Sequence, residues 1–173
     1  MNNNSILLAI LFPLLILVQV LICNHIMLFN VAVPFIFIYF IVRYPIGVSQ
    51  NIALTLAFML GFLVDLFSDT PGLNALACTI LAGIRPAVFY AYVTRDDKTK
   101  RIVPSISSLG WQDYSKYLIS ICSIYCLMVF GIEYLSFASI GLILLMTIAS
   151  AVLTFIVIIG LDSLLPSFKN SLA

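Results

Sequence analysis

Two aspartates four residues apart, Asp65 and Asp69, are the side chains of this sequence best placed to do chemistry. Residues at positions i and i+4 lie on one face of a helix, so both carboxylates would point the same way. They sit beside apolar stretches, where an acid is costly and is retained mainly where it meets a partner, a polar cavity or an ion. Two interpretations stay open: the acids cap helix ends, or Asp65 forms a buried ion pair with Arg85.

Three classes of enzyme would use such residues, and the sequence disfavours each. Gly61, Asp65 and Asp69 match the second half of the signature of CDP-alcohol phosphotransferases, but no acid precedes Asp65, so half of the metal ligands are missing. An intramembrane aspartic protease needs two carboxylates that share a proton, normally brought together from different helices. A serine protease would need His25, the sole histidine, and no nucleophile motif accompanies it. We therefore predict no catalytic residues, no metal and no cofactor.

Composition determines the kind of fold that must position these residues. Of the 173 residues, 63% are apolar and 9% are charged, whereas about 25% charged residues is usual for a soluble domain. So little polar surface cannot cover a soluble fold of this size. At about 20 residues per crossing, the chain accommodates one polytopic membrane domain over residues 1–173. The net charge of +1 creates no field that would attract nucleic acid.

Charge-free stretches predict an all-α integral membrane protein with six transmembrane helices. In lipid, every backbone polar group must be satisfied within the protein, and for a chain this short helices are the economical solution. Polar and helix-breaking residues separate the apolar stretches. The expected helices cover residues of about 5–23, 27–43, 49–66, 71–93, 115–132 and 138–161.

Local signals refine the helix expected over 71–93. Asp69 or Thr70 is a suitable N-cap, and Pro71 is a suitable first helical residue. Arg85 and Pro86 lie inside the same helix, and proline cannot donate a backbone hydrogen bond there. We therefore expect a kink or an early end at this position.

The distribution of basic residues predicts the orientation. With both termini in the cytoplasm, the inner segments are 43–50, 94–116 and the C-terminal tail, and the positive-inside rule places basic residues there. Arg85 is the exception to this pattern. Aromatic residues at the start of the fifth helix, Trp111, Tyr114 and Tyr117, are expected in an interfacial belt. The basic residues that follow the rule are Arg43, Arg95, Lys98, Lys100, Arg101, Lys116 and Lys169.

Small residues on the helix over 71–93 predict close packing. Gly72, Ala75, Thr79 and Gly83 fall near one face, and small side chains let helix backbones approach each other in lipid. Packing within this chain and docking to a partner's transmembrane helix both remain open. The cysteines are interpreted as small packing residues; they are Cys23, Cys78, Cys122 and Cys126.

Several motifs together resemble the MreD family of rod shape-determining proteins. The most specific is the run 61–77, in which Asp65, Asp69, Pro71 and Gly72 stand at the family's spacing. The resemblance covers about residues 10–90, and the second half matches only in hydropathy. The motifs are, in chain order, Phe12-Pro13, Gln19-Val20, the run 34–40, Tyr44-Pro45, the run 61–77 and Arg85-Pro86.

This resemblance implies a non-enzymatic scaffold in the bacterial inner membrane, part of the cell-elongation complex. Its implied partners are the bitopic protein MreC and, through it, the MreB filament and the elongation peptidoglycan synthases. The family's fold is similar to that of the six-helix substrate-binding component of energy-coupling-factor transporters. The runner-up function is therefore a vitamin-binding component of such a transporter, although the short outer loops offer no evident ligand pocket.

Residues assigned to a partner-binding or structural polar seam are Gly61, Asp65, Asp69, Pro71, Gly72, Asn74, Arg85 and Pro86, and those assigned to a helix-packing face are Ala75, Thr79 and Gly83.

Overall fold

The computed structural model describes residues 3–23, 32–68, 70–93, 102–134 and 140–164 of the chain. This described part is all-helical and holds no β-strand, which confirms the predicted fold class at that level. An isolated antiparallel bridge joins Ile46 to Ile102. The helices are α1 (Asn3–Leu21), α2 (Ile38–Arg43), α3 (Gln50–Ser68), α4 (Leu73–Tyr92), α5 (Ile106–Leu109), α6 (Trp111–Tyr134) and α7 (Ile140–Leu164).

Among the described residues, four helices are long and apolar enough to cross a membrane: α3, α4, α6 and α7. A helix of 20 residues is about 30 Å long, which matches the hydrocarbon core of a bilayer. Their outward faces carry large apolar side chains, such as Phe62 on α3 and Ile148 on α7, which are 42% and 63% exposed. These properties are those of a multi-pass membrane protein.

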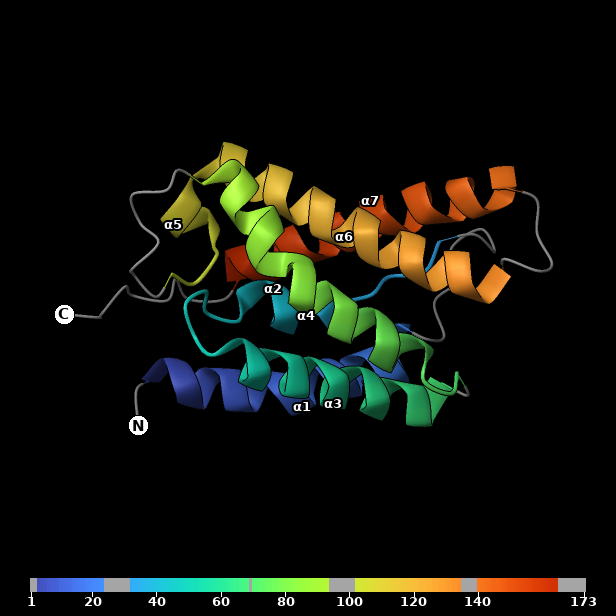
Figure 1. Cartoon of the computed structure of the whole chain (residues 1–173), viewed down its shortest axis with the longest axis horizontal. Helices are drawn as coiled ribbons and strands as arrows, with labels where there is room; N and C mark the ends of the chain where they lie inside the picture. Colours follow the sequence, from blue (N-terminus) through green and yellow to red (C-terminus); the bar gives the residue numbers. More distant parts are fainter. Residues whose placement is uncertain (1–2, 24–31, 69, 94–101, 135–139, 165–173) are drawn as a thin grey trace.

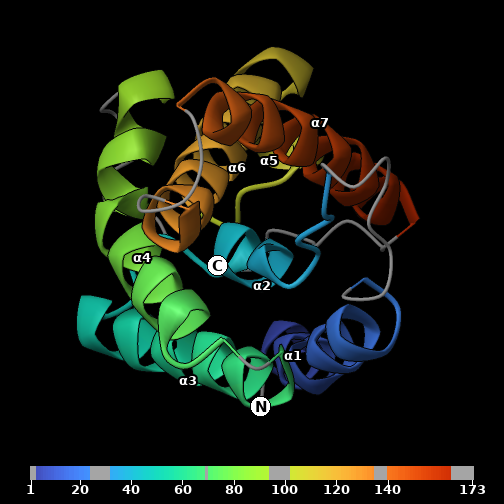
Figure 2. The same cartoon turned by 90° about the vertical axis from the view of Figure 1, so that its right-hand side faces the viewer.

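The long helices surround α2. Viewed along the bundle, α1, α3, α4, α6 and α7 form an outer ring and α2 lies at its centre (Figure 2). In this ring α3 packs on α1 and α4, and α6 packs on α4 and α7. All six residues of α2 are buried, so this short apolar helix forms the middle of the core.

Successive segments run back and forth between two ends of the molecule (Figure 1). The start of α1, the short helix α5, the start of α6 and the end of α7 lie together at one end, which we call the α5 end. The turn between α3 and α4 lies at the other end.

Five of the six helices expected from the sequence appear near their predicted positions. The largest difference in bounds is at α6, which begins at Trp111 and not at the predicted position 115. The expected ranges 5–23, 49–66, 71–93, 115–132 and 138–161 correspond to Asn3–Leu21, Gln50–Ser68, Leu73–Tyr92, Trp111–Tyr134 and Ile140–Leu164.

The helix predicted over 27–43 is wrong for its described residues before position 38. Residues 33–35 are not helical, and helix begins only at Ile38. Pro34 has no backbone N–H to give to a helix. On either side of it, Val33 N–H donates to Ser150 Oγ at 3.0 Å and Phe35 N–H donates to Thr154 Oγ1 at 3.1 Å. Hydroxyl groups of α7 thus replace the hydrogen bonds that a helix would have made.

Gln19 of α1 completes the pairing of this segment from the opposite side. Its Nε2 donates to the carbonyl of Pro34 at 3.2 Å, and its Oε1 accepts the N–H of Ile36 at 2.9 Å. Non-helical backbone is tolerated at membrane depth only where protein groups satisfy it. The segment 32–37 is therefore stabilised by side chains of the first and last long helices.

Pro86 does not end α4, contrary to the early end considered above. The helix continues to Tyr92, six residues beyond the proline. A proline inside a helix removes one hydrogen bond and crowds the carbonyls of the preceding turn. One of these carbonyls, that of Gly83, accepts a hydrogen bond from Gln50 Nε2 of α3 at 3.1 Å. A side chain of the neighbouring helix thus binds a carbonyl of this turn, although the bond that Pro86 removes is the one to the carbonyl of Ala82.

Candidate functional site: buried polar clusters in the helix bundle

Asp65 is the centre of a buried polar cluster between α3 and α4. The residue is 5% exposed, and both carboxylate oxygens accept hydrogen bonds. Oδ1 accepts from Thr70 Oγ1 at 2.8 Å, from Asn74 N–H at 3.0 Å and from Asn74 Nδ2 at 2.9 Å. Oδ2 accepts the N–H of Ala75 at 2.8 Å. Asp65 thus satisfies two of the backbone donors that the start of α4 leaves free.

The start of α4 differs from the sequence prediction. The helix begins at Leu73, and Gly72 precedes it with a left-handed φ of 81°. Pro71 lies in the turn, so it is not the first helical residue. Thr70 does not cap the helix with its side chain: its hydroxyl donates to Asp65 and accepts from the side chain of Asn74, not from a backbone N–H. A carboxylate near the positive end of a helix is stabilising, and α3 supplies this one. Asp69 lies outside the described residues.

Asn74 extends the cluster to α6. Its Oδ1 accepts the hydroxyl of Tyr125 at 2.6 Å, and its Nδ2 also donates to Thr70 Oγ1 at 3.2 Å. The buried ring of Tyr125 makes edge contacts with Phe35 and Phe37, at centroid distances of 5.2 and 5.7 Å. The Asp65 cluster is thereby connected to the non-helical segment at the centre of the bundle.

Gly61 lets α3 and α4 approach closely beside this cluster. A Cβ atom at position 61 would lie 2.4 Å from the carbonyl oxygen of Asn74 and 2.6 Å from the Cα of Ala75. Backbone atoms cannot give way as a flexible side chain can, so any larger residue would force the helices apart. Position 61 therefore requires glycine.

The small-residue face predicted on α4 is divided between two environments. Ala75 is buried against Gly61, so that part of the face packs within this chain. Thr79 is half-buried, and its hydroxyl donates to the carbonyl of Ala75 at 2.7 Å. Gly72 and Gly83 are exposed. The outward residues of α4 thus remain available on the surface of the bundle.

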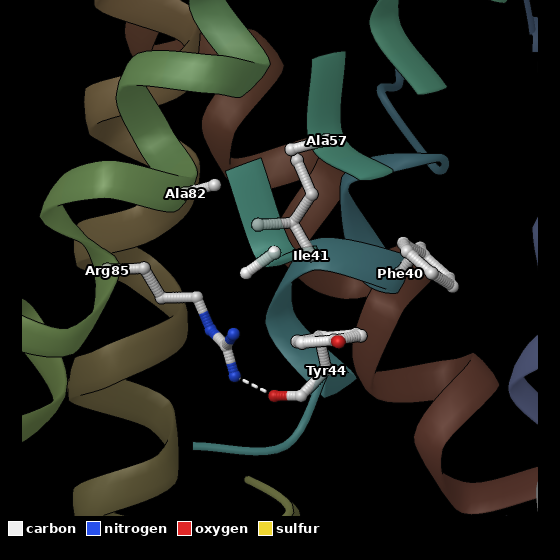
Figure 3. Close-up of a pocket in the computed structure, with 7 residues that line it drawn as sticks. Phe40, Ile41, Tyr44, Ala57, Ala82 and Arg85 are labelled. Carbon is white, nitrogen blue, oxygen red and sulfur yellow. Dashed lines mark hydrogen bonds between the residues drawn. The ribbon is translucent and has the colours of Figure 1, made fainter. Parts of the chain in front are cut away.

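Arg85 does not pair with Asp65, so the ion-pair interpretation is wrong. Its Nε donates to Tyr117 Oη at 3.0 Å. Its Nη2 donates to the carbonyl of Tyr44 and, at 3.4 Å, to that of Val42 (Figure 3). The Val42 carbonyl belongs to the last turn of α2, and Tyr44 is the residue that follows the helix. Arg85 thus joins α4 to the end of the central helix and to α6, while Asp65 acts at the opposite end of α4.

A small cleft lies beside the Arg85 guanidinium, between α2, α3 and α4. Its volume is about 10 Å³, enough for about one water molecule. Figure 3 shows Arg85 reaching down from α4, with Ala82 above it and Tyr44 below. The cleft is lined by Phe40, Ile41, Tyr44, Ala53, Ala57, Ala82 and Arg85.

A second buried cluster, at the α5 end, includes an ion pair that sequence analysis missed. Arg43 Nε lies 3.2 Å from Asp162 Oδ1, and the two side chains are 1% and 3% exposed. Tyr39 Oη donates to the same Asp162 oxygen and accepts from Arg43 Nε, both at 2.9 Å. Ile106 N–H donates to Asp162 Oδ2 at 3.3 Å. Arg43, expected in an inner loop, instead connects α2 to α7 inside the protein.

A signal for this cluster was present in the sequence. Asp162 is an acid at the end of the last apolar stretch, and ionisable residues in such stretches face the protein interior and pair there. The aromatic belt expected at the start of α6 is wrong for Tyr114 and Tyr117. Trp111 is 56% exposed, but Tyr114 and Tyr117 are buried and face the core.

The four cysteines are buried free thiols, as their interpretation as packing residues predicted.

Comparison of the chain with models of protein families, with curated proteins and with solved structures gave no match.

Proposed function

We propose that this chain is a non-enzymatic, multi-pass scaffold in the bacterial cytoplasmic membrane, part of the cell-elongation complex that maintains rod shape. It binds an MreC-type bitopic protein and, through it, couples peptidoglycan synthases to an MreB-type filament. The proposal rests on what the motif residues do in the structure. Asp65, Asn74 and Gly61, which lie in the stretch most similar to MreD, hold α3 and α4 together as one hairpin.

The state of Asp65 supports a structural role. A catalytic carboxylate needs an oxygen within reach of the proton or atom that it acts on. Both oxygens of Asp65 already accept hydrogen bonds from Thr70, Asn74 and Ala75. A carboxylate engaged in this way stabilises the fold of its hairpin.

In the proposed topology the chain crosses the bilayer six times, with both termini inside. The second crossing consists of the non-helical segment 32–37 followed by α2, because this part of the chain runs between the two ends of the bundle (Figure 1). The arrangement is proposed to be that of the substrate-binding component of energy-coupling-factor transporters. The basic residues of the segment 94–116 support a cytoplasmic location for the α5 end under the positive-inside rule.

The surface proposed for the partner's transmembrane helix is the outward stripe of α4. Leu76 and Ile80 are 50% and 41% exposed, and Gly83 and Ala87 are exposed in the following turns. These positions are three or four residues apart, so they share one face. Small residues at Gly83 and Ala87 would let a second backbone approach.

Paired glycine substitutions test this surface. Gly83→Leu places a bulky side chain on the stripe with only ordinary contact to Leu54, because a Cβ at position 83 lies 3.8 Å from Leu54 Cδ2. Gly160→Leu is the matched control, since Gly160 is an exposed helical glycine on α7 with nothing within 4 Å of its added Cβ. Gly83→Leu should reduce co-purification of the MreC-type partner, and Gly160→Leu should not. Equal recovery with both variants would contradict this placement.

Depletion of the protein in its host tests the function itself. Loss of cylindrical form and of sidewall synthesis is expected. Unchanged shape together with a vitamin requirement would instead support the second candidate, a vitamin-binding transporter component.

One feature favours that candidate: the non-helical segment 32–37, because transporters bind ligands at interrupted membrane segments. Mass spectrometry of the purified protein separates the two, since a tight-binding component retains its vitamin.

A further inference from the structure

Arg85 is a buried cation without an acidic partner among the described residues. It is 3% exposed, and its acceptors are a tyrosine hydroxyl and two backbone carbonyls, all formally neutral. Two of the described acids bind other groups. Asp65 accepts hydrogen bonds from the start of α4, and Asp162 forms an ion pair with Arg43. Burying a charge without a counter-charge costs several kcal/mol, and neutral carbonyls offset only part of this cost, so an anion at Arg85 would be stabilising.

The guanidinium retains donors that could bind an anion. Nε and Nη2 are engaged, but Nη1 makes no hydrogen bond to any described residue and is not among the fully buried polar atoms. Nη1 carries two N–H groups. Arg85 lines the cleft together with Tyr44, Ala53 and Ala57, and Figure 3 shows its guanidinium beside Tyr44. The cleft volume of about 10 Å³ admits a single oxygen atom of a larger group that remains outside, but no polypeptide segment.

The position of Arg85 indicates which anion is available. It precedes Tyr92, the last residue of α4, by 92 − 85 = 7 residues, or about 10 Å along the helix. Its side chain reaches toward Tyr44 and hence toward the α5 end, as a long basic side chain does near a membrane interface. Phosphate groups of lipid headgroups lie at that interface, and guanidinium groups bind phosphate well.

We propose that the Arg85 cleft binds a phosphate group, with one phosphate oxygen in the cleft accepting hydrogen bonds from Nη1 and with an anionic phospholipid as the source. The counter-charge that the described residues do not supply to Arg85 then comes from the membrane. This site is independent of the elongation-complex proposal, because it depends only on the surroundings of Arg85.

Lipid binding to the delipidated full-length protein tests the site. Native mass spectrometry is used with phosphatidylglycerol, with diacylglycerol of the same acyl chains, and with inorganic phosphate as a competitor. Wild-type protein should retain phosphatidylglycerol and not diacylglycerol, which lacks only the phosphoglycerol headgroup. Arg85→Gln should bind phosphatidylglycerol about tenfold more weakly or worse, since a charge-assisted hydrogen bond is lost. Diacylglycerol binding equal to that of phosphatidylglycerol would overturn the proposal.

Two further variants keep the test decisive. Lys116→Gln removes a basic charge at the same end of the bundle, but Lys116 is 59% exposed and does not line the cleft, so binding should be unchanged. Ala53→Leu enlarges a half-buried side chain that lines the cleft without altering Arg85, and it should weaken binding even if Arg85→Gln fails to fold. Unchanged binding to Ala53→Leu, or equal loss with Lys116→Gln, would contradict the site. Displacement of phosphatidylglycerol by inorganic phosphate would support recognition of the phosphate group, whereas tighter binding of inorganic phosphate than of phosphatidylglycerol would overturn the lipid as its source.

Discussion

Thr154 on α7 accepts the backbone N–H of Phe35 at 3.1 Å, so a side chain of the last long helix satisfies the backbone of a segment near the start of the chain. Ser150, one turn earlier, does the same for Val33. One helical turn advances about 5.4 Å, and two extended residues advance about 6.6 Å. The two distances are similar, so hydroxyl groups one helical turn apart can accept hydrogen bonds from every second amide of the extended segment.

Removing these hydroxyls should destabilise the protein. In the double variant Ser150→Ala with Thr154→Val, two amides lose their acceptors, and each buried orphan costs about 1–3 kcal/mol. Amide hydrogen exchange at Val33 and Phe35 should also accelerate. Thr55→Val is the matched control, because Thr55 is exposed and donates only to a carbonyl of its own helix. Denaturant titration in detergent measures the change, and equal stability of the double variant and the control would contradict the assignment.

Gly61→Ala should destabilise the contact between α3 and α4. The added Cβ meets backbone atoms of Asn74 and Ala75, and overpacking of this kind costs typically about 1–3 kcal/mol. Gly131→Ala on α6 is the control, since nothing lies within 4 Å of its added Cβ and alanine favours helix. The free energy of unfolding is measured for both variants and should be lower for Gly61→Ala than for Gly131→Ala. A Gly61→Ala protein as stable as Gly131→Ala would show that the helices can separate freely.

Asp65→Asn should weaken the start of α4. The amide retains one acceptor oxygen but places an N–H₂ group where the N–H of Ala75 or of Asn74 now donates. Loss of one charged acceptor from a buried donor costs about 1–3 kcal/mol. Asp113→Asn serves for comparison, because Asp113 is 46% exposed and its pair with Lys116 contributes little. Equal unfolding midpoints for the two variants would be incompatible with capping by Asp65.

Arg43 and Asp162 should show strong energetic coupling in a double-mutant cycle. Arg43→Met or Asp162→Leu alone leaves a buried charge without its partner, which costs about 3–5 kcal/mol. The double variant should cost clearly less than the sum of the two, because neither charge remains. The same cycle on the exposed pair of Asp113 and Lys116 should give a coupling energy below about 1 kcal/mol. Additive effects at Arg43 and Asp162 would refute the buried pair.

The sequence predicted the long helices well because bilayer thickness sets their length. The apolar stretches at 49–66 and 138–161 coincide closely with Gln50–Ser68 and Ile140–Leu164. The stretch 27–43 was equally apolar, but hydropathy does not distinguish a helix from a buried extended segment. What decides between them is a set of acceptors on Ser150 and Thr154, more than 100 residues away.

The candidate site was recognised only in part, because the partners of its side chains lie on other helices. Asp65 was identified as an acid able to cap a helix, and it does so, but the donors belong to Asn74 and Ala75 of the following helix. The pairing of Arg43 with Asp162 could not be derived, because it joins positions 119 residues apart. Spacing along the chain reports neighbours on one helix, whereas these contacts depend on how the helices are arranged around α2.

The hydroxyl pairing of the segment 32–37 also constrains biogenesis. Val33 is synthesised 117 residues before Ser150, the residue that accepts its N–H. While a ribosome delivers the chain to the membrane, the amide groups of this segment have no acceptor from α7 until the final helix emerges. The nascent chain must therefore keep them hydrated, in a transient helix, or sheltered by the insertion machinery, and a truncated product without α7 should be a substrate for quality-control proteases.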